Sequence, residues 1–154
     1  MTVTALRTDL SNIQPLRALF LQENNFQIRY DACHERGWTD SYSLLIDDLL
    51  VAYGSIMGQK RNDRDTVFEY FVVRPFRRRS RDLFQRLLAA SGARFIECQS
   101  NGLLLSSMLY EFSRSVSVNV VLFEDHVLTA LRFQIPSFAP GVLTTRSSNT
   151  KLSR

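Results

Sequence analysis

The sequence is poor in the residues that build metal sites and disulfides. Of its 154 residues only two are cysteine and two are histidine, and the cysteines form no CxxC pair. Two cysteines and two histidines without a CxxC pair make a zinc site improbable, and we expect both thiols to be reduced. Cys33 and His34 are neighbours, which resembles half of a metal or thiol site. Two adjacent residues of a helix also account for the pair, and we favour that interpretation.

Long apolar runs are absent as well. No stretch approaches the roughly 20 residues that a helix needs to span a bilayer, and the N-terminal residues lack the pattern of a signal peptide. We therefore expect a cytoplasmic protein with no membrane partner. The length and the 45% apolar content suit one domain, which we place at residues 1–140. Residues 141–154 (GVLTTRSSNTKLSR) are polar and show no pattern, so we expect a disordered tail.

Acidic residues are outnumbered by basic ones. The chain has 19 lysines and arginines against 15 aspartates and glutamates, which gives a net charge of +4. A positive protein favours an anionic partner, but the total charge does not separate nucleic acid from a phosphate-bearing cofactor or an acidic surface. The position of the charge is more informative, because four arginines fall between Arg77 and Arg81.

The first part of the chain predicts a strand followed by two helices. Residues 2–8 alternate weakly, which is typical of a short strand. Ser11, with Gln14 three residues later, predicts the N-cap of a helix. The apolar residues of that helix recur at helical spacing: Ile13, Leu16, Leu19 and Phe20. Residues 26–36 predict a second, short helix that ends before Gly37.

Three strands and a helix are predicted next. Residues 42–46 and 49–57 indicate two strands joined by a tight turn, with a bulge at Gly54. Residues 67–73 (VFEYFVV) are aromatic or β-branched almost throughout, so they predict the strongest strand of the chain. A helix is expected from Ser80. Its apolar face comprises Leu83, Phe84, Leu87 and Leu88, and Gly92 is its expected C-cap.

A strand, a helix and two closing strands complete the predicted order. Residues 94–99 indicate the strand, and Asn101-Gly102 turns into a helix with an apolar face. Residues 116–123 and 127–135 indicate the closing pair. The order β-α-α-β-β-β-α-β-α-β-β predicts an α/β (α+β) fold, with a mixed central sheet of about six or seven strands flanked by about four helices.

The turn before Ser80 is the most informative part of the sequence. A strand that leads through a turn into a helix N-terminus presents free N–H groups and the positive end of the helix dipole, which together bind anions. Ser80 is a good N-cap, and the arginines around it suit phosphate oxygens. These arginines are Arg77, Arg78, Arg79 and Arg81. A pyrophosphate is the natural ligand, and a solvated basic loop or a nucleic-acid patch is the alternative.

The strong strand ends in Val73-Arg74-Pro75, and an arginine-rich turn and a helix follow. With the order of the elements, residues 66–112 resemble the GNAT superfamily of N-acetyltransferases. There the fourth strand ends in V-x-P, and a pyrophosphate loop of the type Q/R-x-x-G-x-G/A leads into a helix. Arg77 or Arg79 matches the first loop residue, but both loop glycines are absent. Their positions are occupied by Ser80 and Asp82 or by Asp82 and Phe84.

The resemblance implies a GNAT-like sheet with acetyl-CoA as co-substrate. It implies that the pantetheine arm pairs with the strong strand and that the pyrophosphate lies at the turn. The residues implied in cofactor binding are Phe71, Val72, Val73, Arg77, Arg78, Arg79, Ser80, Arg81, Asp82 and Asn101. Glycine lets the backbone approach a phosphate closely, so its absence restricts that approach. Either the additional arginines compensate through side-chain contacts, or cofactor binding is weakened or lost.

Glu69 is the candidate general base for acetyl transfer. It lies on the strong strand between Phe68 and Tyr70. A carboxylate in such surroundings, beside a cleft, suits proton abstraction from an amine, directly or through water. The alternative is a glutamate on the outward face of the strand.

Tyr110 is the candidate general acid. By the resemblance, a tyrosine on the helix after the fifth strand protonates the CoA thiolate. Many family members have N-x-x-A-x-x-x-Y there; Asn101 fits the first position, but Met108 stands at the last. Two residues on a helix correspond to about 200°, so Tyr110 does not replace that tyrosine without a local shift. Asn101 either bonds the pantetheine or caps its helix, and capping is favoured.

These residues indicate an N-acetyltransferase that transfers an acetyl group from acetyl-CoA directly to an amine of a small molecule or protein. The alternative is a catalytically silent GNAT-like module that binds a ligand or partner, which the missing glycines and the displaced tyrosine favour. Nucleic-acid binding is disfavoured, because few aromatic residues alternate with the basic ones. The edge strands leave a homodimer open.

Overall fold

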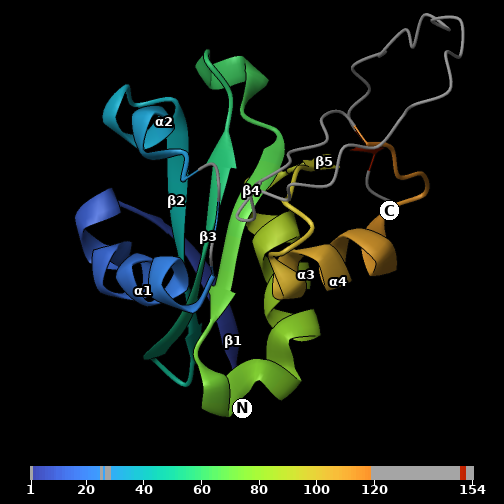
Figure 1. Cartoon of the computed structure of the whole chain (residues 1–154). Helices are drawn as coiled ribbons and strands as arrows, with labels where there is room; N and C mark the ends of the chain where they lie inside the picture. Colours follow the sequence, from blue (N-terminus) through green and yellow to red (C-terminus); the bar gives the residue numbers. More distant parts are fainter. Residues whose placement is uncertain (1, 25, 27–28, 119–149, 152–154) are drawn as a thin grey trace, which may run out of the picture.

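The computed structural model describes residues 2–24, 26, 29–118 and 150–151. These residues form one sheet of six strands in the order β1-β2-β3-β4-β5-β6, with four α-helices and two 3₁₀ helices (Figure 1). The elements in chain order are β1 (Val3–Thr8), α1 (Leu10–Glu23), α2 (Asp31–Glu35), β2 (Thr39–Ile46), β3 (Leu49–Met57), η1 (Arg61–Asp63), β4 (Thr66–Val72), η2 (Arg74–Arg79), α3 (Ser80–Ser91), β5 (Phe95–Ile96), α4 (Leu103–Phe112) and β6 (Thr150–Lys151).

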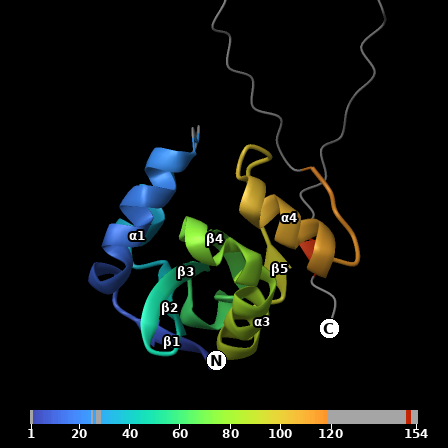
Figure 2. The same ribbon diagram turned by 90° about the horizontal axis from the view of Figure 1, so that it is seen from below.

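The sheet is mixed, as predicted. Neighbouring strands from β1 to β4 are antiparallel, β4 and β5 are parallel, and β5 and β6 are antiparallel. Helices α1 and α2 lie on one face of the sheet, and α3 and α4 lie on the other (Figures 1 and 2). The predicted α/β class is therefore confirmed, and β4 is covered on both faces.

Apolar side chains fill both sides of the sheet. On the α1 face, Ile13, Leu16 and Phe20 pack with Tyr53 and Phe71. A larger cluster joins α3 and α4 to the other face. Its helical members are Leu83, Phe84, Leu87, Leu105, Met108 and Phe112. The helical spacing of these apolar residues directs one stripe of each helix to the sheet.

The β2–β3 hairpin has the tight turn that was predicted. Asp47 and Asp48 both have positive φ, 46° and 66°, as a two-residue hairpin turn requires. Gly54 is not at a bulge, because it pairs in regular register with Tyr70. A Cβ at Gly54 would lie 2.3 Å from Cδ2 of Leu87, so glycine is needed there for α3 to approach the sheet.

Two predicted helix boundaries are wrong. Helix α1 begins at Leu10 and its N-cap is Asp9, so the predicted cap at Ser11 is two residues late. The helix predicted at 26–36 is confirmed only for Asp31–Glu35. Its N-cap residue has a left-handed backbone (φ 56°), which a right-handed helix does not contain, and the helix therefore starts after it.

The predictions for the C-terminal part of the chain lie mostly outside the described residues. Of the closing strands at 116–123 and 127–135, only residues 116–118 are described, and they are in no strand. Within the predicted tail, 141–154, only Thr150–Lys151 are described, and they form β6. No helix in the described part of the chain is long and apolar enough to cross a membrane.

Candidate active site

Strands β4 and β5 separate soon after they meet, and a cavity lies where they part. They pair at only two positions, and the last bond runs from the N–H of Glu97 to the carbonyl of Val67 (2.9 Å). The strand predicted at 94–99 is thus confirmed only for Phe95–Ile96. Beyond this junction a cavity of about 300 Å³ opens beside β4. Its aromatic walls are Phe20, Phe26, Tyr30, Phe68, Tyr70 and Phe71.

The free edge of β4 offers backbone groups to this cavity. The N–H of Val73 donates to a carbonyl of β3 (2.9 Å), whereas the carbonyl of Val72 accepts from Nε of Arg77 (3.2 Å). Because alternate residues of a strand direct these groups to opposite edges, Tyr70 and Val72 face the free edge. Of the predicted pantetheine contacts, Phe71 lines the cavity and Val72 has a carbonyl at the edge, but the N–H of Val73 is occupied.

A β-bulge directs two consecutive side chains of β4 to the same face. The register pairs Ser55 with Glu69 but Ile56 with Val67, so Phe68 is the extra residue. Phe68 contacts two rings from the α2 segment, and Glu69 contacts an arginine of α1. Both side chains therefore face α1 and α2, and a strictly alternating strand would separate them.

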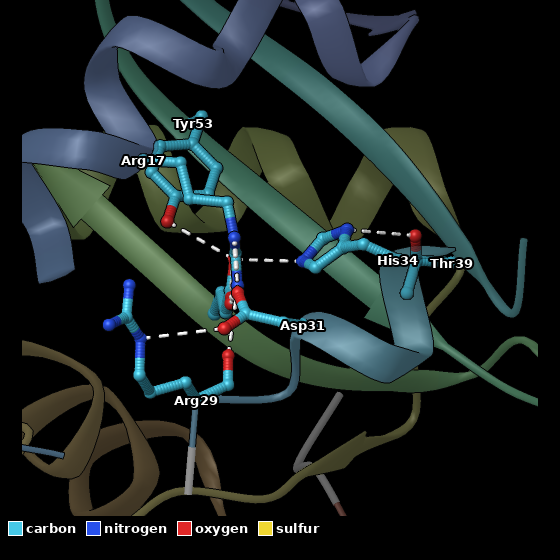
Figure 3. A network of polar contacts seen from close by, with 7 residues as sticks. Arg17, Arg29, Asp31, His34, Thr39 and Tyr53 are labelled. Atoms are coloured by element: carbon cyan, nitrogen blue, oxygen red, sulfur yellow. Dashed lines mark hydrogen bonds and ion pairs between the residues drawn. The ribbon is translucent and has the colours of Figure 1, made fainter. Parts of the chain in front are cut away.

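Glu69 is buried at the centre of a polar network (Figure 3). Nε of Arg17 lies 3.1 Å from each carboxylate oxygen, and Nη2 lies 3.0 Å from Oε1. The hydroxyl of Tyr53 donates to Oε2 at 3.2 Å, and Nε2 of His34 lies 3.2 Å from the same oxygen. These contacts occupy the roughly four acceptor sites that a carboxylate has.

The partners of Glu69 are themselves held in place (Figure 3). Arg17 also donates to Oδ1 of Asp31 and to the carbonyl of Arg29, both at 2.9 Å. Nδ1 of His34 lies 3.0 Å from the hydroxyl of Thr39. Each of the three nitrogens of the Arg17 guanidinium thus donates to an acceptor, as burial of a charged pair requires.

This network changes the interpretation of the predicted base. Burial and the charge of Glu69 raise the pKa of Tyr53 well above its ordinary value, so its phenol stays a donor. Glu69 lines the cavity, but its acceptor sites are occupied and none is left for a substrate amine. The sequence carried one signal of this network: Arg17 stands on the apolar face of its helix, four residues after Ile13 and three before Phe20.

Three of the four arginines of the predicted cluster are paired with carboxylates, and one of these three lies at the mouth of the cavity. Arg77 and Glu23 both line the cavity and form an ion pair, and Glu23 also contacts Nε of Arg74 at 3.3 Å. The other pairs are Arg79 with Asp82 and Arg81 with Glu111. An anion that binds here must therefore replace carboxylate partners of the arginines.

The predicted loop is a 3₁₀ helix. Arg74–Arg79 form η2, which continues directly into α3. Ser80 is the first residue of α3, its N–H donates to the carbonyl of Arg77, and Arg79 is the N-cap. The predicted N-cap at Ser80, and the open N–H groups expected there, are therefore wrong. No glycine is present to hold the turn open, and the backbone closes into a helix instead. Arg78 is exposed beside it.

Helix α4 does not bring the predicted acid to the cavity. Tyr110 is 74% exposed and is not among the residues that line the cavity. Met108, at the position of the family's tyrosine, is buried, and Ser107 lines the cavity. Gly102 is the N-cap of α4, so the predicted capping role of Asn101 is wrong, and Asn101 is exposed.

The structure brings together two residues, Tyr30 and Glu97, whose contact the sequence did not predict. The hydroxyl of Tyr30 donates to Oε1 of Glu97 (2.8 Å), and its ring packs edge-on against Phe68 at 5.3 Å. Burial, and then the charge of Glu97, raise the pKa of Tyr30. Within the described residues, Glu97 has no ion-pair partner. No sequence pattern links positions 67 residues apart.

Comparisons with known proteins identify the fold. No protein-family model and no curated protein matches the sequence. Among solved structures, a predicted acetyltransferase of Clostridium acetobutylicum, determined with acetyl-CoA, has a TM-score of 0.51 at 8% identity and covers 80% of this chain and 96% of its own. AAC(6')-Iy, in complex with a bisubstrate analog, has a TM-score of 0.49 at 14% identity. The match covers 82% of this chain and 100% of that protein. An aminoglycoside acetyltransferase from an uncultured soil metagenomic sample has a TM-score of 0.47 at 12% identity. The match covers 82% of this chain and 97% of that protein.

The similarity to the Clostridium protein extends over most of both chains, although few residues are identical. Together with the β4–β5 separation, it confirms the fold that residues 66–112 predicted. The chain has the fold of the GNAT N-acetyltransferases.

Proposed function

We propose that this chain, which has the GNAT fold, binds acetyl-CoA beside β4 and transfers the acetyl group directly to an amine. The observation that carries the proposal is the free edge of β4 next to an aromatic cavity. An extended chain with amide groups pairs with such an edge as an added strand would, and pantetheine is a chain of this kind. Tyr70 and the N–H of Val72 supply the edge groups, and Phe71 supplies a wall.

The pyrophosphate of the cofactor would be held by guanidinium groups. Arg77 lines the cavity at its mouth, and Arg74 lies beside it on the same carboxylate, Glu23. Guanidinium groups bind phosphate oxygens in a bidentate manner, so a pyrophosphate suits these arginines better than a single carboxylate does. This side-chain site takes the place of the glycine-lined backbone site, because η2 leaves no open loop at Ser80.

Glu69 has a positioning role in this proposal. Its contacts with Arg17 and Tyr53 fix the middle of β4 to α1 and to β3. It thereby holds the cavity wall in shape and keeps the bulge in place. Direct transfer requires an amine that has lost its proton, an attack on the thioester carbonyl and a proton for the departing thiolate.

Calorimetric titration with acetyl-CoA tests the binding step. We expect saturable binding to one site, weakened about tenfold in Arg77→Met, since charge-assisted hydrogen bonds contribute about 1.5–3 kcal/mol each. Arg86→Met is the matched control, because Arg86 is exposed on α3 away from the cavity. No heat of binding at a millimolar excess of acetyl-CoA would contradict the proposal. Release of CoA thiol in the presence of a panel of primary amines then tests transfer.

A catalytically silent module is the second candidate. It is favoured by the exposed position of Tyr110 and by the ion pairs that occupy the arginines of the turn. Acetyl-CoA binding without thiol release, for any amine of the panel, would support this candidate over the enzyme.

A further inference from the structure

A second pocket, of about 490 Å³, lies at the start of β4, whereas the mouth of the first cavity lies at its end. Its walls come from α2 and the segment after it, from the end of β3 and the β3–β4 loop, and from β5 with its flanking residues. The charged residues that line it are Asp63, Asp65, Arg94 and Glu97. Arg94 pairs with Asp65 at 2.6 Å, so Asp63 and Glu97 leave the pocket with a net negative charge.

Glu97 stands between the second pocket and the first cavity. Its side chain lines the second pocket, and it accepts the hydroxyl of Tyr30, which lines the first cavity. Its backbone N–H makes the last bond between β4 and β5. A group that enters from the second pocket therefore meets Glu97 where the two strands part. One carboxylate oxygen holds the Tyr30 proton, and the other has acceptor sites left.

An aromatic ring completes the wall of the second pocket. Trp38 lines it, and the guanidinium carbon of Arg36 lies 4.9 Å from the centroid of its ring. The ring thus attracts positive charge, and Arg36 occupies one of its faces. Carboxylates together with an aromatic wall suit a cation on a hydrocarbon chain, and they repel anions such as acetyl-CoA.

We propose that the second pocket admits the acceptor amine, that this amine carries a further positive charge, and that Glu97 takes its proton. This inference rests on the proposed function, in which the first cavity holds the acetyl-CoA. The two co-substrates thus approach the β4–β5 junction from pockets of different charge. Tyr30 is a positioning residue, because its hydroxyl fixes the carboxylate at the junction.

The proposed step is balanced in atoms and charge. The ammonium of the acceptor gives one proton to Glu97, and the resulting amine forms a C–N bond with the thioester carbonyl. The C–S bond then breaks, and a second proton passes from that nitrogen to the sulfur, which leaves as the CoA thiol. The third proton of the original ammonium stays on the amide nitrogen. Glu97 then releases its proton to solvent through the second pocket.

Two isosteric amines test the charge requirement with the unaltered protein. At saturating acetyl-CoA, 1,4-diaminobutane and n-pentylamine have the same number of heavy atoms, but only the first carries a second charge. We expect kcat/KM for the diamine to be about two- to fivefold higher, since an ion pair with partly exposed carboxylates contributes up to about 1 kcal/mol. Equal kcat/KM for the two amines would overturn the proposal.

Glu97→Gln tests the proton transfer. We expect thiol release to fall about 10²–10⁴-fold, as for loss of a general base, while the calorimetric Kd for acetyl-CoA and the urea midpoint stay unchanged. Glu35→Gln is the matched control, because Glu35 is an exposed carboxylate of α2 outside both pockets. Turnover by Glu97→Gln close to that of the control overturns this proposal alone. Failure of the unaltered chain to bind acetyl-CoA overturns the proposed function with it.

Discussion

Glu69 lies on β4 and Glu97 directly follows β5, and each accepts a hydrogen bond from a tyrosine hydroxyl. Tyr53 donates to Glu69 at 3.2 Å, and Tyr30 donates to Glu97 at 2.8 Å. The difference lies in the other partners. Glu69 lines the first cavity and also contacts Arg17 and His34, whereas Glu97 lines the second pocket and has no ion-pair partner in the described part of the chain.

The same side chain is therefore suited to two tasks. A buried carboxylate with every acceptor site occupied fixes the backbone around it, and removing one partner leaves a charge that water cannot reach. A carboxylate with one fixed hydrogen bond and access to solvent can take up and release a proton. Position on the strongest strand drew attention to Glu69, but contacts favour Glu97 for the chemistry.

The largest expected effect comes from removing the cation beside Glu69. Arg17→Met leaves the buried Glu69 without its guanidinium partner, and we expect the free energy of unfolding to fall by about 3–5 kcal/mol, as for other broken buried ion pairs. Urea denaturation followed by circular dichroism measures this change, with Arg86→Met as the exposed control. A loss below about 1 kcal/mol in Arg17→Met would mean that Glu69 is not held as the structure shows.

Removing the two hydroxyl donors sharpens the comparison. Tyr53→Phe takes one hydrogen bond from a fully buried carboxylate, and we expect a loss of about 1–1.5 kcal/mol in the free energy of unfolding. Tyr30→Phe affects a carboxylate that water reaches, so we expect a loss of about 0.5 kcal/mol or less. The rate of acetyl transfer should show the reverse order, with a larger decrease in Tyr30→Phe than in Tyr53→Phe. Equal effects of the two changes on both quantities would remove the distinction between the carboxylates.

Alkaline pH should weaken the fold through Tyr53. Its pKa is raised in the folded chain, so on raising the pH the unfolded chain loses the phenol proton first, near the ordinary value of 10. The stability that Tyr53 contributes is therefore complete below pH 10 and is lost progressively above it. Urea denaturation at pH 8 to 10.5 should show a steeper decline for the unaltered chain than for Tyr53→Phe, with Tyr110→Phe as the matched control. Identical slopes for the unaltered chain and Tyr53→Phe would contradict this.

The smallest expected effect concerns the mouth of the first cavity. Glu23→Gln removes the carboxylate that pairs with Arg74 and Arg77, and we expect acetyl-CoA to bind about two- to fivefold more tightly, because exposed ion pairs contribute at most about 1 kcal/mol. Calorimetry measures the change in Kd, and Glu35→Gln is the control. Weaker binding in Glu23→Gln would show that Glu23 orients the arginines and does not compete with the cofactor.

The fold was predictable because its signals are local. A run of aromatic and β-branched residues marked β4, and a tight turn between two apolar segments marked β2 and β3. The apolar stripe of α3 with Gly92 as its C-cap placed that helix correctly. The site depended on features that a linear pattern does not carry. The bulge at Phe68 changes which face Glu69 occupies, and the closure of η2 depends on the absence of glycine over a whole turn.

Contacts between distant residues were beyond any pattern in the sequence. Glu69 meets Arg17 across 52 residues, and Tyr30 meets Glu97 across 67. Such pairs depend on how the helices pack on the sheet, and this packing cannot be read from the pattern of a single sequence. The one local trace was Arg17 on an apolar helix face. The cytoplasmic location, the homodimer and the disordered tail stay predictions.

Hydrogen exchange at the backbone of β4, measured by NMR with and without acetyl-CoA, tests the central claim most directly. If pantetheine pairs with the free edge of β4, exchange at the N–H groups of Tyr70 and Val72 should slow on addition of acetyl-CoA. Exchange at Val73, already bonded to β3, should change little. Unchanged exchange at Tyr70 and Val72 with a millimolar excess of acetyl-CoA would contradict binding along this strand.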